Sequence, residues 1–242
     1  MVYVVFSISV IIAIGIFLLF TLPKGKLIIY NFVTRSVSKK DDMPKTKESW
    51  LVRLIKKIAF IASCKIMYRI TYVGLGNIDP SKNYIFASNH ISLIDPIALC
   101  CIIKNYRVMA KEELFKKPFL SWLLPRVGAF PIKRDSTDLT SMRLSMKILK
   151  KDKQNLILFP EATRNGTAKN IEPKTGAIAL AIACDTEIIP VKVGKVSGLF
   201  GEYIVIIGKP YRLELDRDAV KDKEILTKET SKLMQKIFDL SR

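Results

Sequence analysis

The sequence predicts an α/β fold: a mainly parallel, mixed sheet covered by helices, with a helical membrane anchor at the N-terminus. From about residue 70 onward, short apolar runs alternate with helix-like stretches, which is typical of strands connected by helices. Before them, residues 2–22 carry no charge. The 242 residues fit one sizeable domain plus an appendage. We therefore expect an anchoring part, residues 1–69, and a folded domain, residues 70–242.

The uncharged segment Val2–Leu22 would span about 31 Å as a helix, enough to cross a bilayer core. It has no preceding basic stretch and no obvious small-residue cleavage site, so a cleaved signal peptide is not expected. The basic residues that follow Pro23 predict a cell-membrane protein whose folded domain lies on the cytoplasmic face. Because residues 27–33 form a second apolar patch, two placements stay open: the segment crosses the bilayer, or it lies in one leaflet.

Residues 47–69 have the pattern of a basic amphipathic helix. Arg53, Lys56 and Lys57 share one face. The other face carries Trp50, Leu54, Ile58, Ile61 and Cys64. Such a helix suits an anionic membrane surface; the alternative is a solvated helix packed on its own domain.

The charge is strongly positive and unevenly distributed. The formal net charge is +18, and residues 24–69 hold 12 Lys and Arg against 3 Asp and Glu. The expected partner is therefore anionic, either nucleic acid or an acidic lipid surface. The apolar N-terminal segment, and the lack of aromatics interleaved with the basic residues, argue against a nucleic-acid-binding protein and favour the anionic phospholipid membrane, with no nucleic acid as the expected partner.

The four cysteines and the single histidine show no metal-binding spacing. We therefore expect reduced thiols in a cytosolic compartment and no metal.

The expected elements follow the apolar runs. Strands are predicted at 70–73, 84–87, 107–110, 129–132, 156–159, 188–193 and 203–207. Helices are predicted at 96–103, 113–126, 138–151, 174–184 and 216–240. In this architecture functional groups gather at the carboxyl ends of the strands.

The one histidine, His90, follows the predicted strand 84–87, and Asp95 follows five residues later. On a regular helix these two side chains would lie about 140° apart. They meet if residues 90–94 form a turn and Asp95 caps the next helix, with Pro96 as its first residue. A histidine so placed is suited to moving a proton near neutral pH. The alternative is an ordinary cap at Asp95 and a His90 bonded to backbone.

Two further strand ends carry charge. Lys133 and Arg134 follow the run 128–132, while Glu161, Thr163 and Arg164 follow the run 156–160. Lysine, an arginine fork and a threonine hydroxyl are groups that bind a phosphate monoester. We expect these five residues to contact such a substrate at the same edge of the sheet as His90.

Four segments together resemble the glycerolipid acyltransferase family. Residues 89–96 resemble its N-H-x-S-x-x-D signature, residues 128–134 its second block, residues 159–164 its F-P-E-G-T-R block, and residues 189–191 its fourth. They occur in family order over roughly residues 70–215. The resemblance implies the fold of that family. The sequence departs from the family pattern at Ala162, where glycine is usual, and at Asn165, where serine is usual.

The resemblance is strongest to bacterial members that transfer a fatty acyl chain from acyl-CoA or acyl carrier protein to the sn-2 hydroxyl of lysophosphatidic acid, giving phosphatidic acid. It implies no cofactor other than the thioester co-substrate. His90 would then take the hydroxyl proton, Asp95 would orient the imidazole, and Arg164 with Lys133 or Arg134 would hold the phosphate. Glu161 is expected to orient Arg164 or its loop.

Three alternatives stay open. One is an acyltransferase of the same chemistry acting on another lysophospholipid or on glycerol-3-phosphate. Another is a non-enzymatic membrane-surface protein. The third is an acyl-enzyme formed on Ser92, Cys100 or Cys101 with His90 as its base.

Overall fold

A seven-stranded sheet forms the centre of the described part of the chain, residues 69–133, 139–161, 173–195 and 202–241 of a computed structural model. The predicted segments 2–22 and 47–69 lie outside the described residues, apart from Arg69. Within the described ranges, no helix combines the length and the apolar character needed to cross a membrane.

The strands occur close to their predicted positions. They are β1 (Arg69–Val73), β2 (Ile85–Ser88), β3 (Tyr106–Lys111), β4 (Ala129–Ile132), β5 (Asn155–Leu158), β6 (Ile188–Lys195) and β7 (Glu202–Ile207). Their order across the sheet is β1-β7-β6-β2-β5-β3-β4. Neighbours are parallel except for β6 and β7, which are antiparallel. The predicted mainly parallel mixed sheet is therefore confirmed.

The reversal at β7 decides which residues reach the carboxyl edge of the sheet. Five strands point one way, and β7 and β1 point the other way. The start of β7 consequently lies beside the end of β6, with Tyr203 opposite Lys195. His90, which follows the end of β2, lies at this edge.

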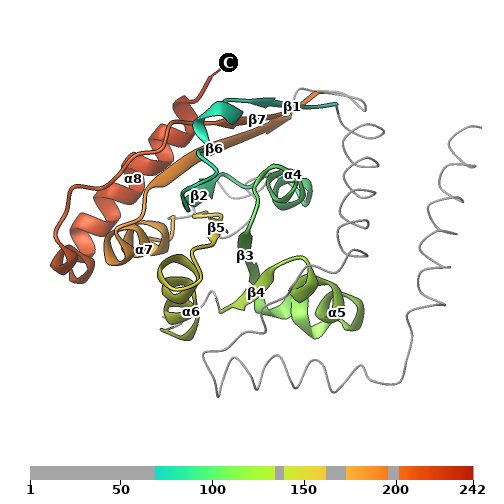
Figure 1. The fold of residues 1–242 in the computed structure, drawn as a ribbon, viewed down its shortest axis with the longest axis horizontal. Helices are drawn as coiled ribbons and strands as arrows, with labels where there is room; N and C mark the ends of the chain where they lie inside the picture. The colour runs from blue at the N-terminus through green and yellow to red at the C-terminus, as the bar shows by residue number, and fades with distance from the viewer. Residues whose placement is uncertain (1–68, 134–138, 162–172, 196–201, 242) are drawn as a thin grey trace, which may run out of the picture.

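Helices cover both faces of the sheet (Figure 1). They are α4 (Ile94–Ile102), α5 (Pro118–Arg126), α6 (Leu139–Lys150), α7 (Gly176–Cys184) and α8 (Lys223–Asp239), with 3₁₀ turns η2 (Leu75–Asn77), η3 (Glu112–Lys116) and η4 (Arg217–Lys221). Alternate strand residues serve the two faces: Ile85 and Ala87 of β2 pack with α6, α7 and α8, whereas Phe86 packs with α4.

Two predicted helices are each divided in the structure, so their prediction as single helices was wrong. The segment 113–126 is η3 followed by α5, which begins at Pro118. Proline has no backbone N–H to continue a helix but is well tolerated in the first turn of a new one. The segment 216–240 is η4 followed by α8, and the Asp222 carboxylate caps α8 by accepting from the N–H groups of Glu224 and Ile225.

Candidate active site

The turn after β2 is held to the neighbouring strand β6 by a side chain. Strand β2 lies between β6 and β5 and is buried throughout. At its end, the Asn89 amide donates to the carbonyl of Val193 at 2.9 Å and accepts from its N–H at 2.7 Å. Because this side chain satisfies both the N–H and the carbonyl of Val193, the main chain of residues 90–94 can turn away without leaving these two groups unpaired.

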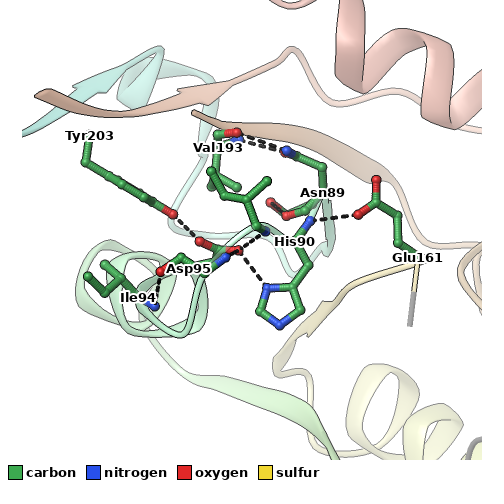
Figure 2. Close-up of polar contacts among 10 residues, drawn as sticks. Asn89, His90, Ile94, Asp95, Glu161, Val193 and Tyr203 are labelled. Atoms are coloured by element: carbon green, nitrogen blue, oxygen red, sulfur yellow. Dashed lines mark hydrogen bonds and ion pairs between the residues drawn. The ribbon is translucent and has the colours of Figure 1, made fainter. Parts of the chain in front are cut away.

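His90 and Asp95 meet across this turn (Figure 2). Nδ1 of His90 lies 2.6 Å from Oδ2 of Asp95. The same oxygen accepts from the N–H groups of Ile91 at 2.6 Å and Ser92 at 2.9 Å. Asp95 is fully buried, whereas the His90 side chain keeps 12% of its surface exposed. The expected pairing of the two side chains is therefore present.

The sequence had suggested that Asp95 caps helix α4, but in the structure it does not. Helix α4 begins at Ile94, so Asp95 lies in its first turn, and Leu93 at the N-cap position makes no side-chain cap bond. The carboxylate turns back toward the preceding turn instead, because two backbone N–H groups and the imidazole there all need an acceptor. The prediction of an Asp95 N-cap was wrong by two residues and in its bonding.

The bonds around Asp95 determine which nitrogen of His90 can act as a base. Since Oδ2 already accepts two backbone N–H groups, it meets Nδ1 as an acceptor, and Nδ1 carries the hydrogen. The lone pair is then on Nε2, which points away from Asp95 in Figure 2. The ring of Phe159 lies against the imidazole, with centroids 4.5 Å apart. The arrangement suits general-base catalysis at Nε2.

Glu161 lies on the other side of the turn. It is 2% exposed, and its Oε2 accepts from the backbone N–H of His90 at 3.1 Å. Its second oxygen, Oε1, is buried with no hydrogen-bond partner described. The structure thus places Glu161 where it restrains the backbone of His90. Of the other four predicted substrate-binding residues, Lys133 is described and exposed, whereas Arg134, Thr163 and Arg164 lie outside the described residues.

Lys133 shares the carboxyl edge with His90 but is not adjacent to it. It follows β4, which is separated from β2 by β5 and β3, so about 14 Å of sheet lies between the two strand ends. A cation that the sequence had not suggested lies nearer: Lys111 ends β3 on this edge and pairs with Glu113 at 3.3 Å.

The three alternative nucleophiles differ in position. Ser92 lies in the turn, where its hydroxyl accepts from the N–H of Ile94 at 3.3 Å. Cys100 and Cys101 lie near the far end of α4, about 8 Å along the helix axis from Asp95. They line a hollow with Arg107 and Gly128, which lie at the opposite edge of the sheet. The cysteines are therefore poorly placed to receive an acyl group beside His90.

Three residues of the site had no role in the sequence-based prediction. Asn89 was visible beside His90, but its pairing with β6 depends on strand order. Phe159 was visible as the end of an apolar run. The third, Tyr203, donates its hydroxyl to Oδ1 of Asp95 (Figure 2). No local signal indicates Tyr203, because the contact needs β7 to run antiparallel to β6.

Comparisons with known proteins identify the family of this chain. The sequence model of the Acyltransferase family matches residues 69–194. A 1-acyl-sn-glycerol-3-phosphate acyltransferase of Bacillus subtilis is 30% identical over 68% of this chain and 84% of its own length. One of Streptococcus pneumoniae is 32% identical over 46% of this chain and 41% of its own.

A solved structure shares the fold. The crystal structure of the 1-acyl-sn-glycerophosphate acyltransferase PlsC from Thermotoga maritima superposes with a TM-score of 0.58 and 19% sequence identity. The superposition covers 90% of this chain and 97% of that one.

Proposed function

Because this chain belongs to the Acyltransferase family, we propose that it transfers a fatty acyl group from a thioester donor to the sn-2 hydroxyl of 1-acyl-sn-glycerol-3-phosphate. The product is phosphatidic acid. The named activity of its relatives supports the acceptor. The observation that carries the chemistry is the His90–Asp95 pair, with Nε2 turned away from its buried partner.

The proposed reaction is a direct transfer. Nε2 of His90 takes the proton of the acceptor hydroxyl as that oxygen attacks the thioester carbonyl. Asp95 stabilises the positive charge that His90 then carries. When the tetrahedral intermediate collapses, the carbon–sulfur bond breaks and the thiolate leaves with the proton from Nε2. The imidazole of His90 thus ends the reaction in the protonation state in which it began.

Arg164, together with Lys133 or Arg134, is proposed to bind the acceptor's phosphate. Arg164 follows β5 in the sequence, and β5 is the strand next to β2. The structure adds Lys111 to the candidate cations of this edge. A glycerol phosphate with its free hydroxyl at Nε2 would extend along the strand ends.

The membrane is the proposed location of the reaction, because lysophosphatidic acid is a lipid and the net charge is +18. The basic residues after Pro23 favour the cytoplasmic face for the domain. The donor is proposed to be acyl-CoA or acyl carrier protein. Both are anionic and suit a basic surface.

In the test, the purified full-length protein is incubated with one donor and one acceptor at a time, and the product is identified by mass spectrometry. The acceptors are lysophosphatidic acid, glycerol-3-phosphate, a lysophosphatidylcholine and a monoacylglycerol. We expect phosphatidic acid from lysophosphatidic acid and no product from the monoacylglycerol, with His90→Ala as the inactive control. Product from the monoacylglycerol at an equal rate would refute phosphate recognition. Product from another lysolipid alone would reassign the acceptor.

A further inference from the structure

The hydroxyl of Tyr203 makes the one described contact to Asp95 that comes from outside the turn. It donates to Oδ1 across 108 positions of sequence. The other three described donors, from His90, Ile91 and Ser92, all meet Oδ2. The two carboxylate oxygens are therefore held from opposite directions, one by the turn and one by β7 (Figure 2).

Tyr203 is a rigid donor. Its side chain is 1% exposed and packs in the core on the α4 face of the sheet with Phe86 and Leu99. Its backbone is paired on both sides, with Ile70 of β1 and with Lys195 of β6. An aromatic ring fixed at both its core contacts and its backbone cannot follow a moving carboxylate.

Rotation of the carboxylate is the motion that this contact opposes. The terminal torsion of an aspartate side chain is broad and roughly twofold. Three donors converging on one oxygen fix that oxygen but leave the plane of the group weakly defined. A donor on the other oxygen defines the plane, and with it the direction in which Oδ2 presents its lone pair to Nδ1 of His90.

We propose that Tyr203 is a positioning residue of the acid–base pair: its hydroxyl fixes the Asp95 carboxylate so that His90 holds its hydrogen on Nδ1 and its lone pair on Nε2. The inference rests on the proposed function for its effect on turnover. Its effect on the imidazole is a property of the resting protein and needs no substrate. Because the Tyr203 side chain is buried, we expect loss of its hydroxyl to lower the rate of transfer and to leave substrate binding nearly unchanged.

The single histidine of this chain makes the test direct. In full-length protein carrying ¹⁵N-labelled histidine and a tag without histidine, the ring nitrogens give one pair of signals whose shifts report the tautomer. The variant is Tyr203→Phe, which removes only the hydroxyl. The matched control is Tyr72→Phe, because the Tyr72 hydroxyl donates to the carbonyl of Ala98 in α4 at 3.1 Å. Like Tyr203, it ties a strand to α4, but the bond described for its hydroxyl goes to the backbone of α4 and not to the Asp95 carboxylate.

For the parent protein and for Tyr72→Phe we expect the Nδ1–H tautomer alone. For Tyr203→Phe we expect a measurable fraction of the Nε2–H tautomer and a fall in kcat of about tenfold, with KM for lysophosphatidic acid and for the donor changed less than twofold. Melting temperatures are measured for all three proteins. If both variants lose the same thermal stability and only Tyr203→Phe changes the tautomer and the rate, lost stability does not explain those changes.

Three results would overturn the proposal: an unchanged tautomer in Tyr203→Phe, a tautomer change of the same size in Tyr72→Phe, or a parent protein with its hydrogen on Nε2. If the parent protein transfers no acyl group to lysophosphatidic acid while Tyr203→Phe still shifts the tautomer, the positioning role stands and the proposed acceptor fails.

Discussion

Asp95→Asn removes a buried negative charge while keeping almost the same side-chain shape. Three donors meet Oδ2 and the Tyr203 hydroxyl meets Oδ1. The NH₂ group of asparagine cannot face the N–H groups of Ile91 and Ser92, since donors would then oppose donors. Its carbonyl oxygen therefore takes the Oδ2 position and its NH₂ faces Tyr203, whose hydroxyl can rotate to accept. His90 keeps an acceptor for Nδ1, and the variant loses mainly the charge.

The size of the effect follows from the charge that forms on His90 during the reaction. With Nδ1 and Oδ2 2.6 Å apart, the centres of the two charged groups are about 4 Å apart. At an effective dielectric constant near 20, such a pair interacts by about 4 kcal/mol. Each 1.4 kcal/mol changes a rate about tenfold. We therefore expect Asp95→Asn to lower kcat about 10³-fold, with a smaller effect on KM.

The assay is the initial rate of thiol release from acyl-CoA at saturating lysophosphatidic acid, in micelles of one detergent. Asp218→Asn is the control, because it makes the same charge change at an exposed ion pair with Lys221 and should stay within twofold of the parent rate. A kcat within tenfold of the parent would refute stabilisation of His90 by the charge of Asp95. Loss of all turnover at an unchanged melting temperature would refute the retained geometry.

The remaining predictions concern three other residues. His90→Ala should abolish nearly all acyl transfer while the melting temperature stays within a few degrees; near-normal turnover would show that the base lies elsewhere. Arg164→Ala should raise KM for lysophosphatidic acid at least tenfold with little change in kcat, and steady-state kinetics at varied acceptor would contradict phosphate binding if only kcat fell. Glu161→Gln keeps an acceptor for the N–H of His90 and should unfold in urea at nearly the parent midpoint. Glu161→Ala leaves that N–H without its acceptor and should cost about 1–3 kcal/mol; equal midpoints for the two variants would exclude this bond as a stabilising contact.

The sequence alone predicted the part of the site that depends on local spacing. Residues 90–95 allow the imidazole and the carboxylate to meet only across a turn, and a turn is what the structure contains. The strands were also predictable, because buried parallel strands are continuous apolar runs. Helix ends were less predictable: Pro118 and Asp222 each mark the start of a new helix, yet both lie within longer stretches of helical pattern.

Contacts between distant strands were not predictable from the sequence. The roles of Asn89 and Tyr203 depend on β6 lying beside β2 and on β7 reversing its direction. The sequence of residues 202–207 does not reveal whether this strand runs parallel or antiparallel to β6, because strands of either direction can be apolar runs of similar length. The hydrogen-bond partners of Asp95 were also not predictable, since a carboxylate at the start of a helix can accept from N–H groups of the helix or of the preceding turn.

The reversed strand β7 also bears on how the enzyme matures. The acid–base pair lies within six residues of sequence, but its restraints come from Glu161, Val193 and Tyr203, the last of them in a strand that also pairs with β1. Contacts of such long sequence separation form late, because closing the intervening chain costs entropy before they stabilise anything. During refolding, turnover should therefore return after the bulk of the helical signal. During synthesis on the ribosome, the chain should acquire catalytic competence only once β7 has emerged and inserted between β1 and β6.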